Sequence, residues 1–179
     1  MSELITGIIS GIVATVAYSI FLLLLRPKIC VSDKLCKVAE NEKGAIIKIK
    51  VVNRTRSMLT NVKYVLRFCQ ELGDGLHQTT IIPPCRPPLE FIDKYSGSDK
   101  KAEYAVRFLY KISSDMLISE GGGWLEFSIH ANHGFSNTSA CVKKKYKCGS
   151  IVSGVFEAET SMKIIPGSAS AHELALLAQ

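Results

Sequence analysis

The residues from Leu4 to Leu25 contain no charged side chain, and this run constrains the chain more than any other feature. Its sequence is LITGIISGIVATVAYSIFLLLL. As an α-helix it would be about 33 Å long at 1.5 Å per residue, which matches the hydrocarbon core of a bilayer. We therefore predict a transmembrane helix over residues 4–25. The remainder of the 179-residue chain is long enough for one ordinary domain.

An apolar segment at this position is either a retained anchor or a cleaved signal peptide. A signal peptide needs a basic start, a short apolar run and a small-residue cleavage site. The chain starts with Met-Ser-Glu, without Lys or Arg, and the apolar run is long and ends in four leucines. These features favour an anchor.

Basic residues flank only the C-terminal side of this run. No Lys or Arg precedes it, whereas Arg26, Lys28, Lys34 and Lys37 follow it. Short cytoplasmic flanks of transmembrane helices carry an excess of Lys and Arg. We therefore expect a single-pass membrane protein with its N-terminus outside and its C-terminal domain in the cytoplasm.

The cysteine count bears on the same question. An even number of cysteines would permit disulfides in an exported domain, whereas a cytoplasmic domain keeps its thiols reduced. The six cysteines are Cys30, Cys36, Cys69, Cys85, Cys141 and Cys148. Several lie in apolar strand patterns, where a thiol acts as a small apolar side chain. We expect reduced thiols.

Small residues follow one stripe of the predicted helix. The stripe consists of Gly7, Ser10, Gly11, Ala14 and Ala17. Small side chains let helices approach closely in lipid, where packing drives association. We expect these residues to pack helices together or to line a pore in a homo-oligomer, with a tetramer favoured. The alternative is a plain anchor, since glycine is common in transmembrane helices.

Beyond Pro27 the apolar residues recur with a period of two, which is typical of β-strands. The alternating segments are 47–51, 62–68, 104–112, 125–131, 136–142 and 151–164. Turn-forming residues separate them, and the proline pairs at 83–84 and 87–88 indicate an irregular crossover. Seven or eight short strands at this spacing predict a mainly β domain over residues 28–165, an antiparallel sandwich or barrel. Residues 166–179 follow a Pro-Gly breaker, and we expect a tail or short helix there.

The sequence contains no convincing catalytic constellation. It lacks a phosphate-binding loop before a helix and lacks G-x-S-x-G, and the glycines at 121–123 lead into a strand pattern. His130, His133, Cys141 and Cys148 lack a C-x-x-C knuckle, and a strand would place the two histidines on opposite faces. A Cys–His nucleophile pair stays open but has no local signature. We expect no enzyme activity, no metal site and no cofactor.

The basic residues are the better indication of function. Lys and Arg number 22 against 16 Asp and Glu, which gives a formal charge of +6. We expect the strand that contains Lys63 to pair beside the strand that contains Lys48. The candidate residues for an anionic ligand are Lys48, Lys50, Arg54, Arg56, Lys63, Arg67, Arg107, Lys111, Lys143, Lys144 and Lys145.

Clustered Lys and Arg attract nucleic acid, nucleotide signals or anionic lipid headgroups. The alternative is a solvated sheet face beside an anionic inner leaflet. Tyr64, Tyr104 and Tyr110 are candidate stacking platforms for bases. Their position on the apolar side of the predicted strands makes them core residues instead.

Three segments resemble a known domain. Val52-Asn53-Arg54-Thr55 after a strand, the strand over 63–68 and the segment His133-Gly134-Phe135-Ser136-Asn137 are similar to the cytoplasmic sandwich of inward-rectifier potassium channels and their small bacterial relatives. The resemblance covers roughly residues 28–165 and implies an immunoglobulin-like β-sandwich. A selectivity-filter sequence and a second membrane helix are absent from the sequence, so potassium selectivity is not carried over.

The layout of one membrane helix before a small cytoplasmic β domain is similar to the membrane effectors of bacterial anti-phage defence, in particular the Hailong-type channel effector. That resemblance implies an oligomer in the bacterial inner membrane that forms an ion channel or disrupts the bilayer. It also implies control by a nucleotide or oligonucleotide signal from a partner nucleotidyltransferase. The alternative from a different class is a non-conducting, membrane-tethered adaptor that docks a protein partner through its sandwich.

Overall fold

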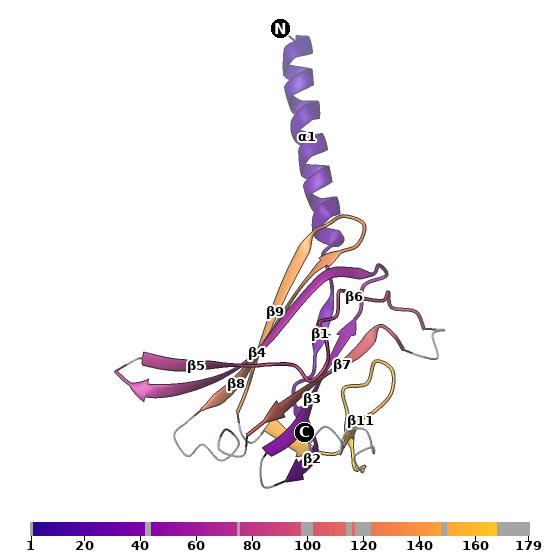
Figure 1. Cartoon of the computed structure of the whole chain (residues 1–179). Coiled ribbons are helices and arrows are strands. Elements are labelled where there is room, and N and C mark those ends of the chain that lie inside the picture. The colour runs from indigo at the N-terminus through magenta and orange to yellow at the C-terminus, as the bar shows by residue number, and fades with distance from the viewer. Residues whose placement is uncertain are drawn as a thin grey trace.

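Figure 1 shows the computed structural model of the chain, in which one long helix stands on a β domain. The structure describes residues 2–41, 44–74, 76–97, 102–113, 116, 123–147 and 150–167. The helix α1 spans Ser2–Leu24, close to the predicted 4–25, and none of its side chains is buried. It is long and apolar enough to cross a membrane. An apolar helix exposed on all sides needs lipid or other helices around it.

The helix ends where Pro27 makes its continuation unfavourable. The last turn tightens, since the amide of Arg26 donates to the carbonyl of Leu23 at 3.2 Å. The hydroxyl of Thr138, from the connection between β8 and β9, donates to the carbonyl of Leu25 at 3.1 Å. The β domain thus satisfies one of the carbonyls that every helix leaves unpaired at its C-terminal end.

Two five-stranded sheets make up the β domain (Figure 1). In the first sheet, β3 is the central strand and pairs with β1, β2 and β7, and β10 pairs with β2. Its strands are β1 (Ile29–Val31), β2 (Leu35–Asn41), β3 (Gly44–Asn53), β7 (Ala105–Ile112) and β10 (Ile151–Ser153). Most pairs are antiparallel, as expected, and the short pair of β10 with β2 runs parallel.

In the second sheet, the order is β5-β4-β8-β9, and β6 pairs with the start of β4. Its strands are β4 (Leu59–Gly73), β5 (Leu76–Ile82), β6 (Phe91–Ile92), β8 (Trp124–His133) and β9 (Ser139–Tyr146). A short pair, β11 (Val155–Phe156) and β12 (Ile164–Ile165), is separate from both sheets. The β4–β5 hairpin extends beyond the body of the domain (Figure 1).

The two sheets share one hydrophobic core. Ile47, Ile49 and Val51 of the first sheet pack in the same cluster as residues of the second sheet. Phe127 of β8 meets Phe108 of β7 with ring centroids 5.8 Å apart. Apolar faces of two sheets packed against each other define a sandwich. The prediction of a mainly β fold with a sandwich after one N-terminal helix is confirmed.

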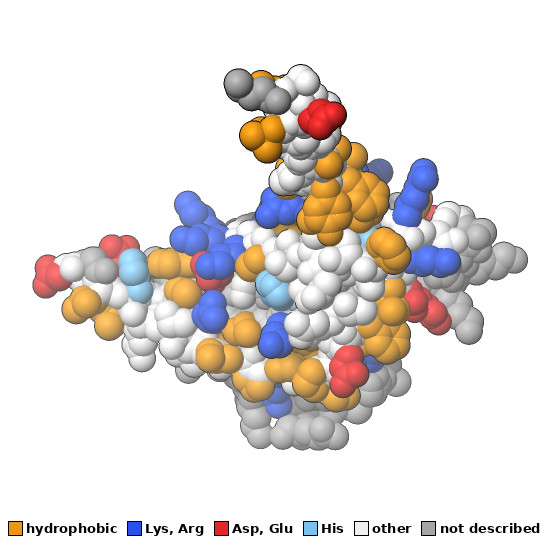
Figure 2. All heavy atoms as spheres, turned by 90° about the horizontal axis from the view of Figure 1, so that it is seen from above, with side chains coloured by type: hydrophobic (Ala, Val, Ile, Leu, Met, Phe, Trp, Pro, Cys, Tyr) orange, Lys and Arg blue, Asp and Glu red, His pale blue; other side chains and the backbone are white. Residues whose placement is uncertain are grey.

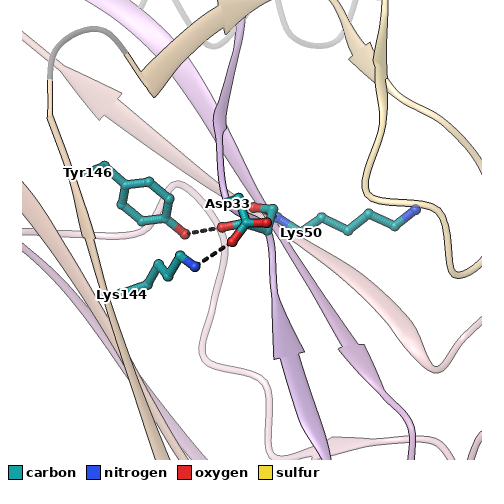
Figure 3. A network of polar contacts seen from close by, with 5 residues as sticks. Asp33, Lys50, Lys144 and Tyr146 are labelled. Atoms are coloured by element: carbon teal, nitrogen blue, oxygen red, sulfur yellow. Dashed lines mark hydrogen bonds and ion pairs between the residues drawn. The ribbon is translucent and has the colours of Figure 1, made fainter.

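A polar network joins the sheets at one side of the sandwich (Figure 3). The hydroxyl of Tyr146 in β9 donates to the carbonyl of Ser32 at 2.7 Å, and Lys144 forms an ion pair with Asp33. Ser32 and Asp33 lie between β1 and β2, so these contacts connect the edge strand of one sheet to a loop of the other. Tyr146 is buried, and its burial raises the pKa of the phenol.

The expected pairing of the Lys63 strand with the Lys48 strand is wrong. Lys48 lies in β3 of the first sheet, whereas Lys63 lies in β4 of the second sheet and pairs with β8. The turn between β3 and β4 carries the chain across the sandwich. Asn53 is buried at its start, and its side-chain amide donates to the carbonyls of Ser57 at 2.9 Å and Asp93 at 2.8 Å.

Segment 154–165 covers the outer face of the first sheet at β2 and β3. The thiol of Cys36 donates to the carbonyl of Gly154 at 2.8 Å. Gly154 has a φ of +149°, and a Cβ there would lie 2.3 Å from the carbonyl oxygen of Ile165, so only glycine fits. The five described cysteines are free thiols. Cys148, the glycines at 121 and 122, and the expected tail from residue 168 onward lie outside the described residues.

Candidate anion-binding face

The cations predicted to bind an anion do not form one site. They divide among the covered outer face of the first sheet, the open outer face of the second sheet and the foot of α1. One of them, Lys144, is used for the ion pair with Asp33 and points to the opposite side of β9 from its two lysine neighbours.

Lys50 is fully buried under segment 154–165. Its ammonium donates to the carbonyls of Glu157 and Ser161, each at 2.6 Å, and to that of Ala158 at 3.4 Å. Figure 3 shows its side chain extending away from Asp33 toward this segment. Burial, and then the charge of its cross-strand neighbour Arg107, lower the pKa of Lys50 from 10.5 to about 8. Its donors are committed to the backbone, so it is a structural cation.

Three other candidates share the first sheet with Lys50. Lys48 is also buried in β3. Arg107 and Lys111 lie on β7 opposite Lys50 and Ile46, so they share the outer face of this sheet, as the alternation predicts. Arg107 is exposed and Lys111 is half-buried. Because segment 154–165 covers Lys50 on this face, the face is less open to a large ligand than the sequence indicates.

The outer face of the second sheet is open and basic. Cross-strand register places Lys63 beside His130 and Cys141, and places Lys143 beside Ser128 in the next row. The following row contains Ile81, Arg67, Glu126 and Lys145. We call these three rows the basic face; its cations are Lys63, Arg67, Lys143 and Lys145. β4 and β9 are two strand spacings of about 4.8 Å apart, so the four cations share a surface about 10 Å wide across the strands.

The four cations of the basic face differ in what holds them. Arg67 lies 3.6 Å from the carboxylate of Glu126, the single acid of the three rows. Lys145 lies over the indole ring of Trp124, 5.1 Å from its centroid. Lys63 and Lys143 are exposed, and neither forms an ion pair within the described part of the chain. Two fixed and two free cations around one carboxylate give this face a net positive charge.

Sequence reasoning missed Trp124, the aromatic side chain beside the basic face. Trp124 lies at every-second-residue spacing from Glu126, Ser128 and His130, and this spacing predicts that all four lie on the same outer side of β8. The tyrosines considered as stacking platforms belong to the interior: Tyr104 and Tyr110 are buried, and Tyr64 packs on Phe108 with centroids 4.1 Å apart. Trp124 packs edge-on with His77 at 5.4 Å.

Arg54 and Arg56 lie at the foot of α1, apart from the basic face. Together with Arg26 and Lys28 they line a cavity of about 530 Å³ between the helix end and the β domain. Figure 2, which looks down from the helix, shows Lys and Arg side chains around the helix base. In the sequence, Arg26 and Lys28 indicated only the orientation of the helix. The structure brings them together with Arg54 and Arg56.

The small-residue stripe of α1 lies on an open helix surface. A Cβ added at Gly7 or Gly11 would meet nothing within 4 Å. The hydroxyls of Ser10 and Thr15 donate to the carbonyls of Gly7 and Gly11, at 3.0 and 2.8 Å. Because these hydroxyls are satisfied inside the helix, the stripe presents a shallow, largely apolar groove.

Within the described residues, the geometry gives no support to catalytic or metal chemistry. Among the described residues, no group of three or more His, Cys, Asp or Glu side chains is placed to hold a metal ion. His130 and Cys141 are cross-strand neighbours, but no hydrogen bond joins these two described side chains. His133 faces inward, where its Nδ1 accepts from the amides of Phe135 and Ser136 at 3.3 and 3.2 Å. Burial raises the pKa of Cys85, which disfavours its thiolate.

The chain was compared with known families and proteins. No protein-family model matches it, and no curated protein matches it. The structure itself defines the class as a β-sandwich domain on one apolar N-terminal helix, with a basic face on its second sheet.

Proposed function

We propose that this protein is a single-pass membrane effector whose β domain binds a polyanionic signal, a nucleotide or oligonucleotide, on the basic face. Its helices assemble through the small-residue stripe into an oligomer, with a tetramer favoured, that forms an ion channel or disrupts the bilayer. The N-terminus lies outside and the β domain in the cytoplasm of a bacterium. A nucleotidyltransferase is the class of partner that supplies such a signal.

The observation that carries the ligand half of this proposal is the basic face. Four cations of two adjacent strand pairs point to one open side of the sheet, and one carboxylate accompanies them. Flat sheet faces with cations and an adjacent aromatic ring suit phosphate-linked ligands, which are bound along their backbone. Within the described residues, Lys63 and Lys143 form no ion pair that a bound phosphate would have to replace.

The ligand half is tested by the salt dependence of oligonucleotide binding to the full-length protein in detergent. Four phosphate contacts on a single strand predict that log K falls with log salt with a slope of about −3. Fluorescence anisotropy of a labelled short oligonucleotide measures this slope. Absence of binding at low salt, or a slope near zero, would remove the polyanion from the proposal.

The assembly half is tested on the helix. Replacing Gly7 and Gly11 by leucine fills the groove along which helices approach, so we expect the oligomer to dissociate and membrane conductance or toxicity to be lost. Ile8→Leu and Ile12→Leu, on other sides of the same helix, form the matched control. Crosslinking in membranes and single-channel recording measure the two properties. Unchanged assembly and conductance in the glycine variants would contradict the proposal.

One observation favours the second candidate, a non-conducting adaptor. The β4–β5 hairpin projects from the sandwich and exposes Leu72, Leu76 and Ile81. Exposed apolar residues on a projecting hairpin are typical of a surface that contacts protein. The two candidates make opposite predictions for conductance: the adaptor leaves the membrane intact whether or not its ligand is present.

A further inference from the structure

The cavity at the foot of α1 is a second cationic site, separate from the basic face. Arg26, Lys28, Arg54 and Arg56 line it, and no carboxylate is among its lining residues in the described part of the chain. Its volume of about 530 Å³ lies in the range of small-ligand pockets. We propose that this cavity binds the phosphate of an anionic phospholipid headgroup.

The cavity wall is built by backbone contacts between the segment after the helix and the turn before β4. The amide of Arg54 donates to the carbonyl of Lys28 at 2.8 Å, and the amide of Lys28 donates to the hydroxyl of Thr55 at 2.8 Å. The side chain of buried Asn53 accepts from the amide of Thr55 at 2.8 Å and so holds the same turn. The two cation-bearing segments are thus fixed relative to each other before any ligand arrives.

In the part of the chain that the structure describes, the four cations lack internal counter-charges. All four are exposed, and none forms an ion pair within the described ranges. Four positive charges around one cavity repel each other, and an anion between them removes that repulsion. Two oxygens of a phosphate can accept from two N–H donors of one arginine at once, which suits Arg54 and Arg56 in the lining of the cavity.

The position of the cavity selects a lipid over a phosphate in solution. It begins at Leu24 and Leu25, where the apolar helix ends, so an inserted helix places its cations at the headgroup level. Phe135 lines the same cavity from the β8–β9 connection and is 82% exposed. An exposed aromatic ring beside cations is typical of the membrane interface. Apolar residues at the helix end and cations in the same cavity match the two parts of a phospholipid, its chains and its headgroup.

This proposal rests on the membrane insertion in the proposed function, but it is independent of the basic face and of channel formation. Native mass spectrometry of the full-length protein in detergent measures the bound lipid directly. The probes are phosphatidylglycerol, phosphatidylcholine and inorganic phosphate. The test variant is Arg54→Glu with Arg56→Glu. The matched control is Lys111→Glu on β7 with Lys163→Glu on segment 154–165, and neither of these lysines lines the cavity. Circular dichroism checks that both variants are folded.

We expect the wild-type protein to retain phosphatidylglycerol at least about tenfold better than phosphatidylcholine, and the arginine variant to lose this preference. The control keeps the preference, and millimolar inorganic phosphate does not displace the lipid. Phe135→Asp also weakens retention, because it removes the apolar wall.

Three results would overturn the lipid site. These are equal retention of the two lipids by the wild-type protein, a preference that survives in the arginine variant, and displacement of the lipid by inorganic phosphate. Extraction of the chain from membranes by alkaline carbonate would overturn membrane insertion as well. Failure of oligonucleotide binding leaves this site intact, so the two proposals fail separately.

Discussion

Replacing Lys63 and Lys143 by glutamate lowers the affinity for a short single-stranded oligonucleotide on the order of 100-fold at low salt. The two lysines lie in adjacent rows of the basic face and are exposed, so the changes do not disturb the core. Each substitution removes an attraction and adds a repulsion to the phosphate chain. Anisotropy titrations measure the loss, and the salt slope becomes shallower by about 1 to 2.

The choice of these two lysines separates ligand binding from folding. Arg67 is paired with Glu126, and Lys145 lies over Trp124, so substituting either would also remove a contact within the sheet. Lys111→Glu with Lys163→Glu changes the net charge by the same amount on the opposite side of the sandwich. An equal loss of affinity in that control would show that overall charge, and not the basic face, attracts the oligonucleotide.

Between about pH 8 and pH 10 the wild-type protein becomes more stable, by about 1–2 kcal/mol after allowance for solvent screening, and Lys50→Met lacks this rise. The pKa of Lys50 is about 8 in the folded protein, against 10.5 as its ordinary value. In this window the unfolded chain binds more protons than the folded one, so stability increases with pH. Denaturant titrations at several pH values measure it.

The increase in stability with pH has an upper limit. Burial raises the pKa of Tyr110 and Tyr146, so above about pH 10 the folded protein retains protons that the unfolded chain releases, and stability falls again.

The control is Lys63→Met, which replaces an exposed lysine on the other sheet and keeps the increase in stability between about pH 8 and pH 10. In Lys50→Met, amides of residues 157–161 also exchange hydrogen faster, because the ammonium no longer fastens this segment. A rise that persists in Lys50→Met would show that another group causes it.

Strand alternation predicts much of the fold because one face of most strands packs on a single core. In β8 the buried and half-buried residues alternate without exception, as the sequence between Trp124 and His133 indicates. The same reasoning fails for β3, where all ten residues are buried. Segment 154–165, which follows about a hundred residues later, covers the outer face of β3, so no local pattern in the sequence of β3 predicts that this face is buried.

The site was harder to predict than the strands. Parity alone places Lys63 and Arg67 on one side of β4 and separates Lys144 from Lys143 and Lys145. It does not say which strand lies alongside. The turn after β3 carries the chain to the second sheet, where β4 pairs with β8. The cavity at the helix foot combines four cations from two segments, and only the tertiary contact between Lys28 and Arg54 brings them together.

The bond between Thr138 and Leu25 gives the β domain a mechanical connection to the helix. The β8–β9 hairpin contributes Lys143 and Lys145 to the basic face, and the connection at its end touches the last turn before Pro27. Lys143 is only about 14 Å along β9 from its first residue, Ser139. Because β8 and β9 are hydrogen-bonded along this length, any displacement of the hairpin at Lys143 would reach the last turn of the helix through the bond between Thr138 and Leu25.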